Sequence, residues 1–188
     1  EKGLPAVSGY ECGSFEHLWA LRGMNNFLAD LLDEPEFLTP LIEKVSDLKA
    51  QIAAGYAKAG VDIVWTGDDL GSEISMLMSP EVWRKHLKSC VKKIVNRAKS
   101  ANPDVLMAFH SDGYMEPIIP DLIEVGIDIL QAVQPECMDI AKLKEEYGEE
   151  ISFWGTMGTQ STMAFGTPEE VKAVVKERIM TVGKGGGL

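Results

Sequence analysis

Apolar residues along the first part of the chain recur at a helical spacing. Their period predicts a helix that begins at Pro35, a favoured first helical residue, and ends near Gly60. The positions that set this period are Leu38, Leu41, Ile42, Val45, Leu48 and Ile52. A shorter helix is expected over residues 24–32, with a loop before it. The next apolar run, residues 61–66, is short and rich in β-branched residues, so it predicts a buried strand.

Signals for helix starts divide the rest of the chain. Ser79 and Pro80 form an N-cap and a first helical residue, and they predict a helix that runs to about residue 100. The segment Thr167-Pro168-Glu169-Glu170 is a capping box that begins a helix reaching about Val182. Between them the pattern predicts, in order, a strand at 104–109, a helix at 115–125, a strand at 127–133, a helix from Asp139 to about residue 148, and a strand at 151–154.

Strands and helices therefore alternate, which is typical of a parallel sheet covered by helices. Doubly wound sheets and barrels share this pattern. No Gly-x-Gly-x-x-Gly segment follows any predicted strand, so the main signature of a doubly wound sheet is missing. Polar residues instead follow the C-terminal end of every strand, where barrel enzymes build their active sites. We expect an α/β fold of the (β/α)8 TIM-barrel type.

Length and composition indicate how many domains to expect. With 188 residues and 45% hydrophobic residues, residues 1–188 are expected to form a single domain. The first residue is Glu1 and the chain stops in a glycine-rich turn at Leu188, so we expect further sequence on either side. An incomplete barrel would expose strand edges and helix faces. Either that missing sequence or self-association, as in a homodimer, is expected to cover them.

Charge and cysteine usage limit the partners and the compartment. A formal net charge of -11 disfavours binding to nucleic acid or to an acidic membrane surface. Neither a membrane-spanning run nor a signal peptide is visible. Cys12, Cys90 and Cys137 lack paired spacing, which suits a reducing compartment better than a disulfide framework. We expect a cytoplasmic protein.

Two adjacent carboxylates follow the first predicted strand. Asp68 and Asp69 are flanked by Gly67 and Gly71, which allow a tight turn. Paired carboxylates can divide into an acid and a base, or can bind a cation, because neighbouring negative charges push their pKa values apart. The structural alternative is that one of them caps the next turn.

A histidine follows the second predicted strand. His110 leaves an apolar run and needs a hydrogen bond or a ligand to offset its burial, and Asp112 could orient its imidazole or share a metal with it. The alternative is a core histidine satisfied by a backbone carbonyl. Four further residues are expected to line a substrate pocket: Glu11, Gln134, Met157 and Gln160.

The motifs at the predicted strand ends, taken in their order along the chain, resemble those of the uroporphyrinogen decarboxylase superfamily. That superfamily includes porphyrinogen decarboxylases and cobamide-dependent methyltransferases. The motifs are Asp68-Asp69-Leu70-Gly71, Ser79-Pro80-Glu81-Val82-Trp83, His110-Ser111-Asp112-Gly113, Gln134-Pro135-Glu136, Gly155 and Gly166-Thr167-Pro168-Glu169-Glu170-Val171. The resemblance covers essentially the whole chain. It implies a (β/α)8 barrel of about twice this length or slightly less, of which this chain is the C-terminal part without the first strands or the final strand.

The two branches of that superfamily imply different chemistry. The decarboxylase needs no metal or cofactor, and it binds a substrate with many carboxylates through an arginine-rich N-terminal motif that this chain lacks. Thiol methyltransferases bind zinc through a His-x-Cys pair, where His110 stands, and through a later cysteine. Here the second position is Asp112, and Cys137 is a candidate replacement for a cysteine ligand. A carboxylate in that position still permits a metal site formed by His110 and Asp112.

The resemblance and the acidic strand ends favour the methyltransferase-like branch. The implied reaction moves a methyl group between a corrinoid held by a partner protein and a small-molecule acceptor. His110 and Asp112, with Asp68 or Asp69, would bind zinc or act as acid and base. The alternatives are a uroporphyrinogen decarboxylase-type carboxy-lyase of porphyrin biosynthesis and a non-catalytic ligand-binding homologue.

Overall fold

A five-stranded parallel sheet forms the centre of the computed structural model, which describes residues 3–9 and 13–188. The strands are β1 (Val7–Gly9), β2 (Ile63–Gly67), β3 (Leu106–Ser111), β4 (Ile129–Ala132) and β5 (Ser152–Gly155). Their order in the sheet is the order in the chain. Right-handed crossovers between sequential strands all fall on the same side of a sheet, as in a barrel wall, whereas a doubly wound sheet reverses its order. The arrangement confirms the prediction of an α/β barrel segment.

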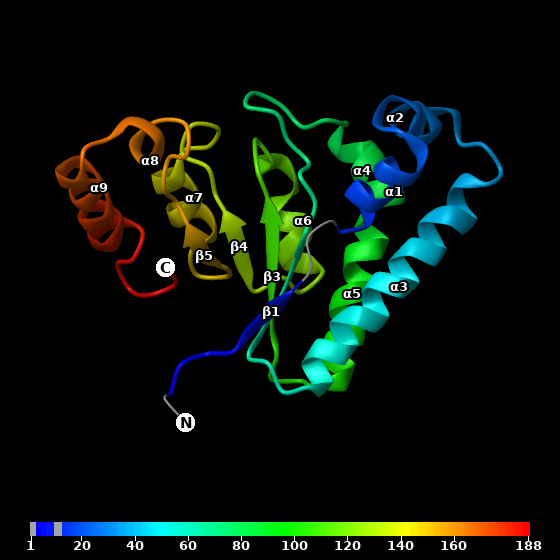
Figure 1. Ribbon diagram of the computed structural model, residues 1–188, viewed down its shortest axis with the longest axis horizontal. Helices are drawn as coiled ribbons and strands as arrows, with labels where there is room; N and C mark the ends of the chain where they lie inside the picture. The colour runs from blue at the N-terminus through cyan, green and yellow to red at the C-terminus, as the bar shows by residue number, and fades with distance from the viewer. Residues whose placement is uncertain (1–2, 10–12) are drawn as a thin grey trace.

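Helices separate the strands in the order expected from the sequence. In the described residues they are α1 (Ser14–Arg22), α2 (Met24–Asp33), α3 (Leu38–Lys58), α4 (Pro80–His86), α5 (Lys88–Ala101), a 3-10 turn (Glu116–Ile118), α6 (Ile119–Glu124), α7 (Ile140–Tyr147), α8 (Thr162–Phe165) and α9 (Pro168–Thr181). Figure 1 shows α1 to α5 gathered toward one end of the sheet and α7 to α9 toward the other. In this part of the chain, no helix is long and apolar enough to cross a membrane.

The predicted caps are present. The Ser79 side chain accepts a hydrogen bond from the backbone N–H of Val82, and the Asp139 side chain accepts one from Lys142. Thr167 and Glu170 form the reciprocal capping box at the start of α9. Each of these motifs depends on residues three apart in sequence, so local spacing was enough to predict them.

Some predicted boundaries are wrong. The helix expected from Pro35 begins at Leu38, because Pro35 forms a turn in which its carbonyl accepts the backbone N–H of Leu38. The helix expected to span residues 80–100 is interrupted at Leu87, which leaves α4 and α5 as separate helices. The strand predicted at 104–109 is displaced by two residues, so His110 is part of β3 instead of following it.

β1 and α1 lie where a loop was expected. β1 has only three residues, too few to show an alternating pattern, and it is held by parallel pairing with β2. α1 has little amphipathic character, and its buried Phe15 and Leu18 belong to the main core. Tertiary contacts rather than local periodicity therefore define both elements.

The sheet register aligns the residues that matter for the site. Gly67 of β2 pairs with His110 of β3, His110 pairs with Gln131 of β4, and Gln131 pairs with Trp154 of β5. The core beneath this row contains the fully buried Met107 of β3. Because the strands are parallel, their C-terminal ends meet along one edge of the sheet.

Asp121 of α6 connects this helix to α4 and α5. Its carboxylate accepts hydrogen bonds from Arg84 Nε at 2.9 Å and from Lys88 Nζ at 2.7 Å, and its side chain is 10% exposed. Burial alone would raise the pKa of Asp121, but the hydrogen bonds from Lys88 and Arg84 outweigh it and lower the pKa. The interaction therefore stabilises the fold above the unfolded-state pKa, and this contribution is lost as the pH falls through the lower, folded-state pKa.

Asp121→Asn is expected to lower the free energy of unfolding at pH 7 by about 1–3 kcal/mol, because two cations lose a charged acceptor. The difference from the unmodified protein should shrink as the pH is lowered below the ordinary aspartate range. Urea unfolding at pH 7 and at pH 3 measures both effects. Glu124→Gln is the matched control, since Glu124 pairs with the same Lys88 but is 66% exposed. An equal loss in both variants would contradict the prediction.

Candidate active site

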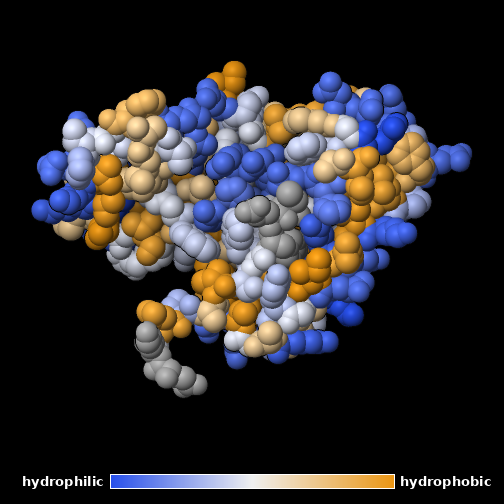
Figure 2. Space-filling view, viewed as in Figure 1, coloured by the Kyte–Doolittle hydropathy of each residue, from blue (hydrophilic) through white to orange (hydrophobic). Residues whose placement is uncertain are grey.

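Three side chains from neighbouring strand ends form a compact cluster. Asp69 is the second residue after the end of β2. His110 belongs to β3, and Asp112 directly follows that strand. His110 Nε2 lies 3.3 Å from Asp69 Oδ1, and one ligand atom from each of the three residues lies within 4.8 Å of the other two. Figure 2 shows hydrophilic residues gathered in the middle of this face, over the upper ends of β3 and β4 as seen in Figure 1. The cluster thus occupies the C-terminal edge of the sheet.

Gln131 fixes the imidazole of His110 from the neighbouring strand. Its Oε1 forms a hydrogen bond with His110 Nδ1, and the Trp65 ring packs edge-on against the imidazole with centroids 5.6 Å apart. An amide oxygen can only accept, so this hydrogen bond requires a hydrogen on Nδ1. Nε2 is consequently the nitrogen that faces Asp69.

The turns that carry the two aspartates are held together. The backbone N–H of Asp112 donates to Asp69 Oδ1 at 3.0 Å. Buried Ser111 accepts from the backbone N–H of Leu70 at 3.0 Å and donates to the carbonyl of Asp112 at 2.9 Å. Each turn thus donates a backbone hydrogen bond to the other, and these two bonds fix the spacing of Asp69 and Asp112.

Electrostatics couple His110 to Asp69. Partial burial alone would lower the pKa of His110, but hydrogen bonds with Asp69 and Gln131 outweigh it and raise the pKa. The same contact with His110 is the main cause of a lowered pKa at Asp69. The pair therefore favours an imidazolium and a carboxylate, and a cation that binds Nε2 must displace its proton.

Asp68 and Asp69 have different surroundings although they are adjacent in sequence. Asp68 is 5% exposed, and its Oδ1 accepts the backbone N–H of Glu16 at 2.9 Å, which places the carboxylate at the start of α1. Burial raises the pKa of Asp68 to about 7. Asp68 lies outside the three-residue cluster, and it accepts a hydrogen bond from the start of α1, a helix that precedes it in the chain, and not from the turn that follows it.

Glu16 is a site residue that the sequence did not reveal. Its carboxyl group accepts the backbone N–H of Asp69, and its charge interacts with those of Asp69, His110 and Lys49. Burial and the neighbouring Asp69 charge raise the pKa of Glu16. The segment was expected to be a loop, and only the packing of α1 against the end of β2 brings Glu16 to this position.

The structure separates the other predicted residues. Gln134 is buried and its Oε1 accepts the backbone N–H of Gly113 at 3.2 Å, so it supports the β3 turn. Gln160 is exposed, and its backbone N–H donates to Glu136 Oε1 at 3.2 Å. Met157 is half-buried in the loop after β5. Glu11 lies outside the described residues.

Two cysteines in the described part of the chain are free thiols. Cys90 is buried in α5, and burial raises the pKa of its thiol to about 11, which suits a small core residue. Cys137 is half-buried and is not one of the three clustered residues. Cys12 lies outside the described residues. The ligand atoms gathered here are therefore one imidazole nitrogen and two carboxylate oxygens.

Sequential parallel strands with polar side chains at their C-terminal ends define a protein of the TIM-barrel class. A family model described as "Uroporphyrinogen decarboxylase (URO-D)" matches residues 8–187, and the chain belongs to that family. This match confirms the family resemblance recognised in the sequence.

Two relatives are longer than this chain. It is 27% identical over 162 residues to a uroporphyrinogen decarboxylase from Chlorobaculum tepidum, which covers 86% of this chain and 41% of that protein. The solved structure of a methyltransferase from Methanosarcina mazei superposes with a TM-score of 0.81 at 22% identity, over 96% of this chain and 51% of the other. The chain thus spans about half the length of these relatives or less, and the structural likeness establishes the shared fold.

Proposed function

We propose that this chain is the catalytic part of a methyltransferase-like enzyme that moves a methyl group between a corrinoid protein and a small acceptor. The observation that carries the proposal is the cluster of Asp69, His110 and Asp112, whose ligand atoms lie within 4.8 Å of one another at the strand ends. Residues 1–188 would form a single domain that supplies part of the barrel, and the reaction would take place in the cytoplasm.

The clustered residues fit a divalent metal. Zinc binds histidine nitrogen and aspartate oxygen at about 2.0–2.2 Å, so its tetrahedral ligands lie a little over 3 Å apart, and the observed spacing needs only small side-chain adjustments. Two carboxylates make a harder ligand set than thiolates do. A bound zinc ion would keep an acceptor thiol in its thiolate form at neutral pH.

Neighbouring residues orient the ligand atoms of His110 and Asp69. Gln131 keeps the hydrogen of His110 on Nδ1 and directs Nε2 toward the cluster. The backbone N–H of Asp112 holds Asp69 Oδ1, so the second carboxylate oxygen of Asp69 remains available. A corrinoid protein and a small-molecule acceptor are the partners that this proposal requires.

A methyl-transfer assay tests the proposal directly. Protein from the complete gene, purified without chelator, is incubated with methylcobalamin and a panel of small thiols, and methylated thiol is measured. Formation of product that a chelator abolishes and added zinc restores is the expected result. Absence of product with every thiol, together with porphyrinogen turnover, would overturn it.

A decarboxylase is the second candidate, favoured by the 27% identity to the curated uroporphyrinogen decarboxylase. In that case His110 and Asp69 would act as an acid–base pair without metal. Porphyrinogen turnover that resists a chelator would establish it. The carboxylates of the cluster oppose a substrate rich in carboxylates, since like charges repel. Ligand binding without turnover would instead indicate a non-catalytic homologue.

Gln131→Leu is expected to weaken zinc binding by about 10–100-fold, because His110 loses the partner that orients its ring. Gln131→Glu keeps an oxygen acceptor and should restore most of the affinity. Competition with a chelating dye gives the dissociation constants, and nitrogen NMR of His110 reports which ring nitrogen carries the hydrogen. Equal zinc affinity in Gln131→Leu and the unmodified protein would show that Gln131 does not position the imidazole.

A further inference from the structure

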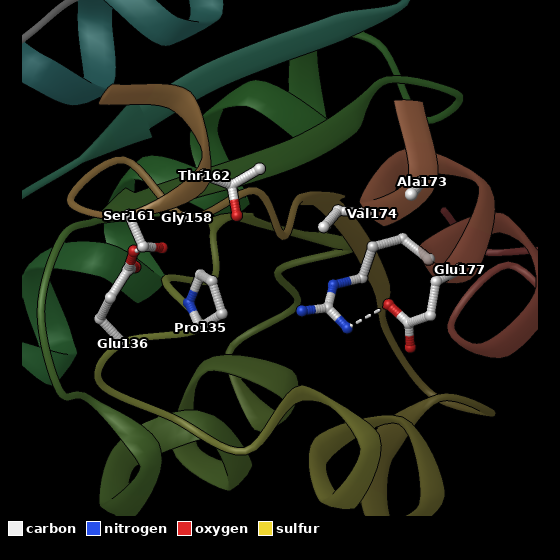
Figure 3. Close-up of a pocket in the computed structure, with 9 residues that line it drawn as sticks. Pro135, Glu136, Gly158, Ser161, Thr162, Ala173, Val174 and Glu177 are labelled. Atoms are coloured by element: carbon white, nitrogen blue, oxygen red, sulfur yellow. Dashed lines mark hydrogen bonds and ion pairs between the residues drawn. The ribbon is translucent and has the colours of Figure 1, made fainter. Parts of the chain in front are cut away.

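A cavity of about 400 Å³ lies between α9 and the loops that follow β4 and β5 (Figure 3). Its lining includes Pro135, Glu136, Gly158, Ser161, Val174, Glu177 and Arg178. None of the three clustered residues of the candidate active site belongs to this lining. The cavity still lies at the C-terminal end of the strands, where barrel proteins bind their ligands, and its volume falls in the range of small-molecule sites.

Arg178 supplies positive charge from α9. Its side chain is 23% exposed, its Nε donates to the carbonyl of Thr156 at 3.1 Å, and its Nη1 pairs with Glu177 at 2.6 Å. These contacts hold the guanidinium in one orientation. Its Nη2 has no hydrogen-bond partner within residues 3–9 and 13–188, which leaves one edge of the group for a ligand oxygen.

Glu136 supplies negative charge from the loop after β4. Its Oε1 accepts hydrogen bonds from Ser161 Oγ at 2.7 Å and from the backbone N–H of Gln160 at 3.2 Å. A Cβ at Gly158 would lie 2.5 Å from the same oxygen, so glycine is what allows this approach. Burial alone would raise the pKa of Glu136, but these hydrogen bonds outweigh it and lower the pKa. The carboxylate is thus ionised and fixed in place.

The remaining wall is partly apolar, with Pro135 and Val174 among its residues. Two carboxylates and one guanidinium line the cavity, so the lining carries one more negative than positive group and opposes a simple anion. A role limited to attaching α9 to β5 would explain the Arg178 contact with Thr156. It would not explain why a second, separately held charge of opposite sign lines the same cavity.

We propose that this cavity binds a small amino-acid-like zwitterion, with its carboxylate on Arg178 and its ammonium group on Glu136. The proposal concerns a second ligand site and does not depend on the reaction at the His110 cluster. The apolar wall between the two charged groups would contact the carbon chain of the ligand.

Calorimetric titration of protein from the complete gene tests this, with ω-amino acids of increasing length from glycine upward as probes. Propionate and ethylamine carry only one of the two charges and serve as comparison ligands. One member of the series is expected to bind at least about tenfold more tightly than either, since each charged contact contributes separately. Failure of every amino acid to bind, or equal binding of propionate or ethylamine, would overturn the proposal.

Two variants locate the ligand. Val174→Trp fills the cavity and keeps the contacts of Arg178, and it should abolish binding. Glu136→Gln removes one charge from an exposed side chain and should weaken binding by about tenfold. Lys92→Gln, at an exposed position of α5 outside the cavity lining, is the control and should bind normally. If Val174→Trp loses stability, Glu136→Gln alone decides, and unchanged binding in that variant would place the ligand elsewhere.

Discussion

His110→Ala is expected to remove bound metal from the protein and to lower methyl-transfer turnover by about 100-fold or more. His110 provides the single nitrogen ligand of the cluster, and its imidazole is the ring that lies beside Asp69. Without it the carboxylates of Asp69 and Asp112 lose the imidazole between them, and their mutual repulsion further weakens a site that has lost one ligand. The effect should be the largest of any single substitution at the site.

Elemental analysis of protein purified without chelator measures this loss, together with the methyl-transfer assay. His86→Ala is a matched control, because His86 lies at the end of the outer helix α4 and is not part of the cluster. The expected outcome is stoichiometric metal in the unmodified protein and in His86→Ala, and none in His110→Ala. Metal retained in His110→Ala, or absent from all three proteins, would refute a metal site at this position.

Much of the fold could be predicted from local patterns. The strands at residues 61–66 and 127–133 were recognised from short apolar runs, and Ser79, Asp139 and the Thr167 capping box from their spacing. Each of these signals is contained within a few residues. The first and last residues of each strand could not be predicted in this way. A strand ends where its pairing ends, and pairing depends on the neighbouring strand.

The remaining elements depend on contacts that are distant in sequence. The carboxylate of Asp68 holds the start of α1, because it accepts the backbone N–H of Glu16. The two residues are 52 positions apart in the sequence. No local pattern distinguishes Asp68 from Asp69, yet one faces α1 and the other faces His110. Glu16 reaches the site through the same long-range contact, which is why no local pattern predicted its position.

The candidate site shows the same division. His110, Asp69 and Asp112 could be chosen as candidates from their positions at the predicted strand ends, because parallel strands bring their C-terminal ends together. The role of Gln131 could not, because it depends on the register that pairs Gln131 with His110. Glu136 and Arg178 line the same cavity only because α9 lies beside the loops that follow β4 and β5.

Gly113 links the fold to the candidate site. Its φ is +77°, and a Cβ there would lie 2.4 Å from the carbonyl oxygen of Gly71. Its backbone N–H also donates to Gln134 Oε1. Any side chain at this position would therefore push apart the two turns that carry Asp69 and Asp112.

Gly113→Ala is expected to lower the free energy of unfolding by about 2–5 kcal/mol, from left-handed backbone strain together with overpacking against Gly71. Gly60→Ala is the matched control, because Gly60 has φ +83° but nothing within 4 Å of an added Cβ, so it should lose only about 1–2 kcal/mol. Urea unfolding measures both variants, and dye competition measures zinc affinity. Zinc binding should weaken in Gly113→Ala alone, since only that change displaces Asp112 relative to Asp69. Equal destabilisation in both variants, with zinc affinity unchanged, would mean that the close approach of the turns does not hold the cluster.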